Sequence, residues 1–218
     1  MNHFFVTIMN LANKLTLSRI IIIPFFLGFL LFGTHVKNAF LQSLLLWLGA
    51  ASIIFATITD YYDGKIARRL GVVSSFGKLM DPLADKIIVM AGYVVLVEIK
   101  YPGTTGPLIP SWIVVIILAR EFFVTGLRQI ALERNTVIEA DRLGKHKTGW
   151  QLGLLIGITS LLALRATLMP FAFFQKIALY YDIAFQCALF VTLCIVLTLT
   201  ICSGFSYFYK NRHLININ

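Results

Sequence analysis

The chain has 218 residues, of which 58% are apolar and 13% are charged. Soluble domains carry about a quarter charged residues, so this composition excludes an ordinary soluble globule and favours an all-α integral membrane protein with a single domain, residues 1–218. The 19 Lys and Arg residues exceed the 10 Asp and Glu residues, which gives a net charge of +9. This excess alone is compatible with nucleic acid, an anionic membrane surface or an anionic substrate, and the positions of the charges must decide.

The first 16 residues precede the first long apolar run and carry apolar side chains at near-helical spacing. This spacing predicts a short N-terminal amphipathic helix in the headgroup layer of a membrane, and a terminus without structure is the alternative. The apolar run that follows has no small-residue cleavage site behind it, and more apolar runs come after it. A cleaved signal peptide is therefore disfavoured.

Six segments are predicted to be transmembrane helices, because a helix needs about 20 mostly apolar residues to cross the hydrocarbon core. Four of them contain long windows without charge, and the other two carry ionisable residues toward one end. The predicted spans are residues 17–36, 38–60, 81–97, 110–132, 148–164 and 183–209. Between the last two, residues 164–180 hold Pro170 between Arg165 and Lys176, and this segment is predicted to be an interfacial loop or a short helix.

The basic residues of this topology gather on one side of the membrane. With six spans both termini share a side, and that side holds 15 of the 19 Lys and Arg residues. Since cytoplasmic loops carry the excess of Lys and Arg, both termini and the loop after the second span are expected in the cytoplasm. The other side keeps Lys37, Lys100, Arg165 and Lys176.

The cysteines Cys187, Cys194 and Cys202 all fall in the last apolar run, which carries no motif. Their spacing of 7 and 8 residues places them along one side of a single helix, where they cannot easily bridge one another. They are expected to be small, lipid-compatible residues of the core.

Four aspartates flank the loop between the second and third predicted spans. Asp60 and Asp63 end one span, and Asp81 and Asp85 begin the next. Because the separations are three and four residues, the members of each pair share a helix face. If the two helix ends face each other, the carboxylates converge and repel unless cations neutralise them. Hard oxygen ligands of this number favour two divalent cations, Mg²⁺ or Mn²⁺, and a solvated helix end with local ion pairs is the alternative.

The residues between the two pairs suit an anionic ligand. Gly64 and Gly77 have no side chain and permit close approach to the backbone, and Ala67 keeps the wall shallow one turn on. Lys65 and Arg68 add positive charge. Beside two divalent cations, these features predict a phosphate or pyrophosphate site.

The spacing D-x2-D-G-x2-A-R-x8-G-x3-D-x3-D resembles the signature of the CDP-alcohol phosphotransferase family. The stretch NKLTLSRIIIIP before the first span is also similar to the family, although Ala12 stands where the family usually has proline. Farther along, REFFVTGLRQIALE and GKHKTGWQ look most like the members that use glycerol phosphate as acceptor, so the resemblance reaches from about residue 10 to 151. The eight signature positions are Asp60, Asp63, Gly64, Ala67, Arg68, Gly77, Asp81 and Asp85.

The resemblance implies six transmembrane helices, usually in a homodimer, with a site open to the cytoplasm of a bacterial cell. It also implies the reaction, in which the hydroxyl of an alcohol attacks the lipid-linked phosphorus of CDP-diacylglycerol and CMP leaves. Asp60, Asp63 and Asp81 would be metal ligands, and Asp85 would be both a ligand and the general base. The residues implied to contact CDP-diacylglycerol are Asn13, Thr16, Gly64, Arg68 and Ser74.

Basic residues in or beside membrane helices are costly and therefore usually functional. Arg120 and Arg128 lie about two turns apart on one face of the predicted span 110–132. Glu121 is expected to point elsewhere and to form a local ion pair. Together with Lys147, the two arginines are predicted to bind the phosphate of an acceptor such as sn-glycerol 3-phosphate. A set of positive-inside anchors is the alternative. Inositol phosphate stays open as an acceptor because it is also anionic, whereas serine gives no reason for a second anion site.

Two other classes of membrane protein also use clustered aspartates. A prenyltransferase binds Mg²⁺ and a diphosphate, but its motifs resemble DDxxD and no adjacent Asp pair exists in this chain. A cation or proton transporter would place carboxylates near the midplane between broken helices, whereas these aspartates lie at helix ends on one side. Both classes are less favoured than the phosphotransferase.

Overall fold

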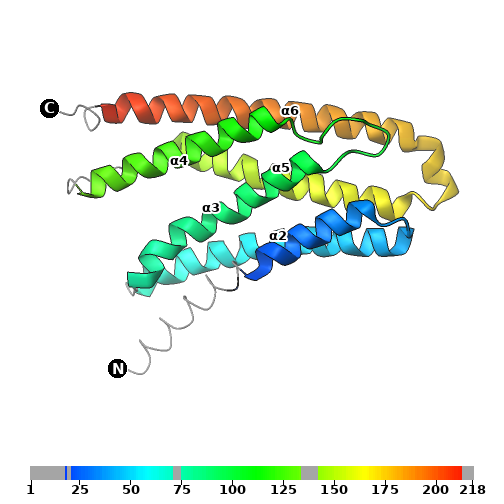
Figure 1. Cartoon of the computed structure of the whole chain (residues 1–218), viewed down its shortest axis with the longest axis horizontal. Coiled ribbons are helices and arrows are strands. Elements are labelled where there is room, and N and C mark those ends of the chain that lie inside the picture. Colours follow the sequence, from blue (N-terminus) through cyan, green and yellow to red (C-terminus); the bar gives the residue numbers. More distant parts are fainter. Residues whose placement is uncertain (1–17, 19–20, 71–74, 134–141, 213–218) are drawn as a thin grey trace, which may run out of the picture. The chain divides into compact units, whose positions relative to one another are not determined.

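The computed structural model describes residue 18 and residues 21–70, 75–133 and 142–212; within these ranges, the side chains of 60–85, 132–133, 142 and 145 are not described. Its described residues form two compact units. The first unit runs up to Val95 and includes Leu155–Leu179, and the second comprises Leu96–Leu154 and the residues from Tyr180 onward. The helices are Ile21–His35, α2 (Ala39–Leu70), α3 (Ser75–Glu98), α4 (Ser111–Glu133), α5 (Arg142–Leu168) and α6 (Ala172–Asn211) (Figure 1).

The predicted all-α fold class is confirmed over the described ranges, in which the longest connection between helices joins α3 to α4. α2 does not stop at the predicted residue 60 but continues to Leu70, and α3 begins at Ser75, before the predicted residue 81. At a rise of 1.5 Å per residue, the 32 residues of α2 span about 48 Å, which exceeds a hydrocarbon core of about 30 Å. The charged segment that follows the predicted end of the second span at residue 60 is helical up to Leu70, and the chain is helical again from Ser75.

The prediction of an interfacial loop or short helix over residues 164–180 is wrong. α5 continues to Leu168 and α6 begins at Ala172, so only a tight turn separates two long helices. Pro170 ends α5, because proline disfavours helical geometry at the preceding residue and has no N–H to donate. The backbone N–H of Phe171 then donates to the carbonyl of Leu168 at 3.0 Å, which closes the turn.

Three described helices are long and apolar enough to cross a membrane. These segments are Ala39–Thr59 within α2, His146–Leu168 within α5, and α6; Ile21–His35 is apolar but shorter. α4 carries Arg120, Glu121 and Arg128, whose charges lower its hydropathy. The count of six spans stays a prediction, and the N-terminal helix predicted for residues 1–16 lies outside the described residues.

The first unit is held together by apolar packing between helices. The Ile21–His35 helix lies against α2, and Phe26, Leu30 and Ile53 are fully buried (Figure 1). A methyl group at Gly92 of α3 would come within 2.6 Å of the Leu155 side chain of α5, so this glycine permits the close approach of the two helices. The indole N–H of Trp47 in α2 donates to the Thr167 hydroxyl of α5 at 3.0 Å, which adds a polar contact.

The second unit begins with the connection between α3 and α4. Its turn contains Gly103, whose φ of 86° favours glycine, and the N–H of Thr104 donates to the carbonyl of Tyr101 at 3.0 Å. The Tyr101 ring stacks on Phe185 with centroids 4.5 Å apart, and its hydroxyl donates to Asp182 at 2.5 Å. These contacts attach the connection to the N-terminal part of α6.

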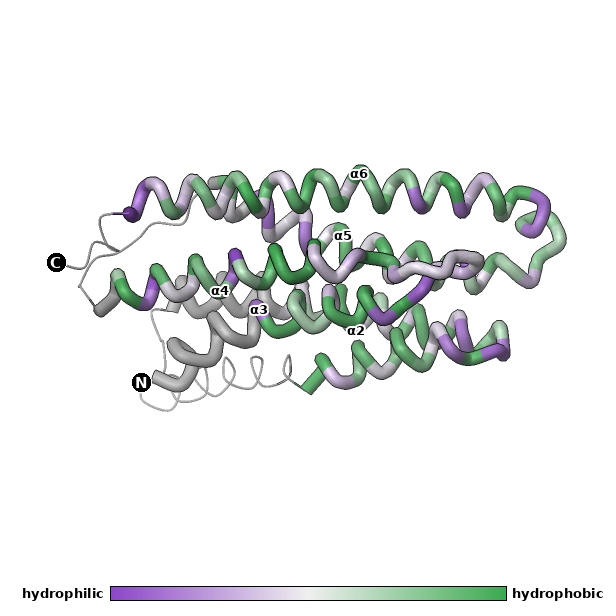
Figure 2. The backbone as a smooth tube through the Cα atoms, turned by 45° about the horizontal axis from the view of Figure 1, so that its top comes forward, coloured by the Kyte–Doolittle hydropathy of each residue, from purple (hydrophilic) through white to green (hydrophobic). Residues whose placement is uncertain are grey.

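The surface of the described helices is apolar and part of the interior is polar. Phe40 and Phe205 are 75% and 72% exposed, whereas Thr200 and Ser203 of α6 are fully buried. Figure 2 shows apolar residues along most of α6, with hydrophilic residues toward its ends. Such a distribution is typical of a protein surrounded by lipid, because soluble proteins rarely expose large continuous apolar surfaces.

The three cysteines lie in one helix, α6, as predicted, and all are free thiols. They are exposed, however, so the expectation that they pack in the core is wrong. α6 buries a different set of positions, which includes Val196, Thr200, Ser203 and Tyr207.

Candidate functional site

The acidic motif lies on two consecutive helices of the first unit. Asp60 and Asp63 belong to α2, and Asp81 and Asp85 belong to α3. Because both helices are continuous through these positions, each pair falls within about one turn, as the spacing predicts. Four residues separate Leu70 from Ser75, which keeps the end of α2 and the start of α3 within about 18 Å of each other.

The donor set of the acidic motif fits divalent cations in its chemistry. Four carboxylates within 26 positions offer the hard oxygen ligands that Mg²⁺ and Mn²⁺ prefer. Where the structure describes side chains, it brings no three His, Cys, Asp or Glu residues together as a metal site. The side chains of the four aspartates and of Arg68 lie outside that described part, and Gly64 falls within α2. Asn13, Thr16 and Ser74 lie outside the described residues.

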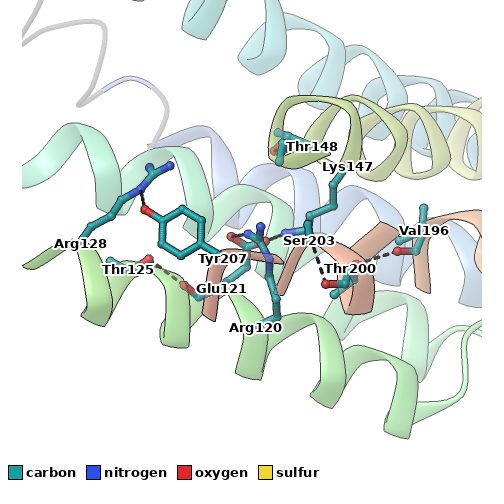
Figure 3. A network of polar contacts seen from close by, with 11 residues as sticks. Arg120, Glu121, Thr125, Arg128, Lys147, Thr148, Val196, Thr200, Ser203 and Tyr207 are labelled. Atoms are coloured by element: carbon teal, nitrogen blue, oxygen red, sulfur yellow. Dashed lines mark hydrogen bonds and ion pairs between the residues drawn. The ribbon is translucent and has the colours of Figure 1, made fainter. Parts of the chain in front are cut away.

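The basic residues predicted to bind the acceptor phosphate belong to the second unit, and two of them meet there. Lys147, near the start of α5, is fully buried and forms an ion pair with Glu121 of α4. The other carboxylate oxygen of Glu121 lies 3.6 Å from a terminal guanidinium nitrogen of Arg120, whose side chain is 12% exposed. Figure 3 shows the Lys147 side chain extending from α5 toward Glu121 and Arg120.

The expectation that Glu121 points away from this cluster is wrong, whereas the expected local ion pair is present, with the adjacent Arg120. Its carboxylate lies between Arg120 and Lys147, with 16% of its side chain exposed. Two cations and one anion leave the three groups with a net charge of +1. Because charges with little access to water interact strongly, this cluster favours a further anion over a cation.

Arg128 lies apart from this pair of cations, against α6. Its Nε–H donates to the hydroxyl of Tyr207 at 2.9 Å, and its guanidinium carbon lies 5.6 Å from the centre of the Tyr207 ring. Figure 3 shows the arginine extending along the tyrosine from the side of α4. Arg120 and Arg128 therefore have different partners, one a carboxylate and the other a neutral hydroxyl.

An apolar groove of about 470 Å³ runs between α4 and α6 beside Arg120. Phe123, Phe205 and Phe208 line it, and Gly204 leaves room for the arginine stem, since an added methyl group there would lie 3.3 Å from the Arg120 Cγ. The methylene groups of Arg120 thus pass along apolar surface while the guanidinium reaches Glu121.

The contribution of α6 is absent from the sequence prediction, although the sequence carries a signal for it. Within an otherwise apolar run, polar residues recur at spacings of three and four, which marks one face of a helix. The structure buries most of that face, and its Tyr207 contacts Arg128. The residues of this polar stripe are Thr200, Ser203, Tyr207 and Asn211.

Comparison with known proteins agrees with the motif. The family model described as CDP-alcohol phosphatidyltransferase matches residues 9–186. The chain is 37% identical over 208 residues to the CDP-diacylglycerol--glycerol-3-phosphate 3-phosphatidyltransferase of Bacillus subtilis (strain 168), covering 93% of this chain and 95% of that protein. It is 38% identical to the protein of the same name from Rickettsia typhi (strain Wilmington), covering 91% and 95%. A probable phosphatidylglycerophosphate synthase of Mycobacterium tuberculosis is 41% identical over 143 residues, covering 65% and 61%.

Proposed function

The chain belongs to the CDP-alcohol phosphatidyltransferase family, and from this premise we propose that it transfers the phosphatidyl group of CDP-diacylglycerol to sn-glycerol 3-phosphate. The products are phosphatidylglycerophosphate and CMP. The observation that carries the proposal is the similarity over nearly the full length to relatives named for this reaction. The buried cationic cluster supports an acceptor with a net negative charge, because an acceptor without a phosphate, such as zwitterionic serine, gives less reason for two cations at the site.

The aspartates of α2 and α3 are proposed to perform the chemistry. The acceptor hydroxyl oxygen forms a bond to the phosphorus that carries diacylglycerol, and the bond from that phosphorus to the CMP oxygen breaks. Asp85 accepts the proton of the hydroxyl as general base. Asp60, Asp63, Asp81 and Asp85 are the residues proposed to hold two divalent cations, Mg²⁺ or Mn²⁺, which would neutralise the charge that develops on the phosphate oxygens.

Five further residues are proposed to hold CDP-diacylglycerol. Gly64, one residue after Asp63, permits close approach of the nucleotide, and Arg68, one turn farther along α2, supplies a fixed positive charge for its phosphates. Ser74, which follows α2, is proposed to contact the nucleotide and its phosphates as well. Asn13 and Thr16, which precede the first span, are proposed to border the same nucleotide pocket.

The purified full-length protein is expected to release CMP from CDP-diacylglycerol only when glycerol 3-phosphate and Mg²⁺ or Mn²⁺ are present. Chelation by EDTA should abolish the release, and added Mn²⁺ should restore it. Radiolabelled CDP-diacylglycerol with competing acceptors measures the preference among glycerol 3-phosphate, inositol phosphate and serine. Release of diphosphate would instead indicate prenyl transfer, and ion flux without CMP would indicate a transporter.

Arg120, Arg128 and Lys147 are proposed to bind the phosphate of the acceptor. Arg120→Gln is expected to raise the KM for glycerol 3-phosphate by about 10- to 150-fold, since a hydrogen bond to a charged group contributes about 1.5–3 kcal/mol. The KM for CDP-diacylglycerol should stay within twofold. Arg165→Gln in α5 is the matched control and should change neither value. An unchanged KM for glycerol 3-phosphate in Arg120→Gln would contradict the assignment.

The placement in the membrane is proposed to be that of six spans with both termini and the active site facing the cytoplasm of a bacterial cell. The support is the split of 15 to 4 in the Lys and Arg residues, together with the apolar exterior of the described helices. After replacement of the three exposed native cysteines, thiols introduced in residues 65–80 should resist labelling from outside.

The proposed assembly is a homodimer. Light scattering on the purified protein measures the mass of the assembly and so tests this proposal.

A further inference from the structure

Tyr207 joins α6 to α4 through both its ring and its hydroxyl. The side chain is 2% exposed, and the ring packs in a buried cluster with Val124 and Leu127 of α4. Its hydroxyl accepts the Nε–H of Arg128 at 2.9 Å. The tyrosine is therefore held by packing, and its hydroxyl is a fixed point for a long and flexible arginine side chain.

This contact leaves most of the guanidinium of Arg128 available. A guanidinium has five N–H donors, and only the Nε–H points to Tyr207. Within the described ranges, Arg128 makes no other hydrogen bond or ion pair, and it is exposed. Both terminal nitrogens can therefore donate in parallel to two oxygens of one phosphate, which is the strong bidentate arrangement that lysine cannot make.

The neutrality of the Tyr207 hydroxyl sets Arg128 apart from the other two cations. Arg120 and Lys147 both interact with the carboxylate of Glu121, which offsets part of their charge. A phenol hydroxyl offsets none, so Arg128 keeps its full charge for a ligand. The hydrogen bond to Tyr207 also limits the rotamers of the Arg128 side chain before the ligand binds. This restriction lowers the entropy cost of forming the bidentate contact.

We propose that Tyr207 is a positioning residue that directs the terminal nitrogens of Arg128 at the phosphate of the acceptor and so favours phosphorylated over neutral alcohols. The proposal rests on the proposed function and adds α6 to the residues that set its acceptor specificity. The chemistry recognised is a phosphate monoester, whose dianion matches an arginine that is held in place and not neutralised.

Kinetics of Tyr207→Phe test this role, because the substitution removes the hydroxyl and keeps the ring that packs on Val124 and Leu127. The expected result is a rise of about tenfold in the KM for glycerol 3-phosphate, with kcat and the KM for CDP-diacylglycerol within twofold. Tyr209→Phe is the matched control: Tyr209 lies two residues away, is exposed, and has its ring 4.7 Å from the guanidinium carbon of Arg212. It should leave both KM values unchanged.

A double-mutant cycle separates positioning from general damage. In an Arg128→Gln background, adding Tyr207→Phe should raise the KM for glycerol 3-phosphate no further, because the hydroxyl acts only through the arginine. Effects that multiply in the double variant, or a Tyr207→Phe variant that changes both KM values alike, would overturn the positioning role. The positioning role would also be overturned if the wild type released CMP with glycerol 3-phosphate and the Tyr207→Phe variant had the same kinetics as the wild type. A wild type that releases no CMP would overturn the proposed function itself.

Discussion

Replacing Asp85 by asparagine is expected to lower CMP release by at least about 100-fold, even with saturating Mn²⁺, because general-base catalysis contributes about 10²- to 10⁴-fold. Asparagine keeps the size and one oxygen of the side chain but cannot accept the proton of the attacking hydroxyl. Asp85 lies one turn of α3 beyond Asp81. It is therefore proposed to be less fully engaged by the two cations than Asp81, and a carboxylate fully engaged by cations would accept a proton poorly. Single-turnover CMP release by the purified variant, measured across pH with both substrates saturating, provides the readout.

Asp182→Asn is the matched control for this substitution. Asp182 accepts a hydrogen bond from the Tyr101 hydroxyl in the second unit, and the amide oxygen of asparagine can accept the same bond. Its activity should therefore stay close to that of the wild type. If Asp85→Asn turned over at the wild-type rate with Mn²⁺ present, Asp85 would not be the general base. A large loss in both variants would instead point to general sensitivity of the fold to carboxylate removal.

Glu121→Gln is expected to lower the thermal unfolding midpoint of the purified protein by about 6 °C or more. Breaking a buried ion pair from one side costs about 3–5 kcal/mol, and about 2–4 °C is lost per kcal/mol in a chain of this size. The cause is Lys147, which is fully buried and loses the charge of its carboxylate partner. Thermal unfolding in detergent, followed by circular dichroism, measures the shift.

Two further variants make the Glu121 prediction specific. Glu98 is exposed at the end of α3, so Glu98→Gln should leave the midpoint within about 1 °C, since surface substitutions usually change stability by less than about 0.5 kcal/mol. Adding Lys147→Met to Glu121→Gln should restore at least half of the lost stability, because replacing a buried pair by apolar groups of similar volume is often neutral. A double variant less stable than Glu121→Gln would show that Lys147 is stabilised mainly by other contacts.

The sequence predicts the helices of this chain better than their ends. Windows without charge locate α2, α5 and α6, because the length of an apolar run is a local property. The same windows place the end of the second span at residue 60, whereas α2 continues to Leu70. Charge ends the apolar run but not the helix, since Lys and Arg are good helix formers. Between α5 and α6, the apolar patch around Pro170 suggests a separate segment, and the proline instead marks one turn.

The acidic motif is determined by the sequence alone, because its pairs are spaced by three and four residues and periodicity fixes the shared face once a helix forms. The family that this motif resembles is also the one whose model matches residues 9–186. The partners of Glu121 and Arg128 were decided only by tertiary structure. Lys147 lies 26 residues after its partner Glu121, and Tyr207 lies 79 residues after its partner Arg128. Which face each helix turns toward its neighbours depends on packing among α4, α5 and α6, and no local spacing contains that information.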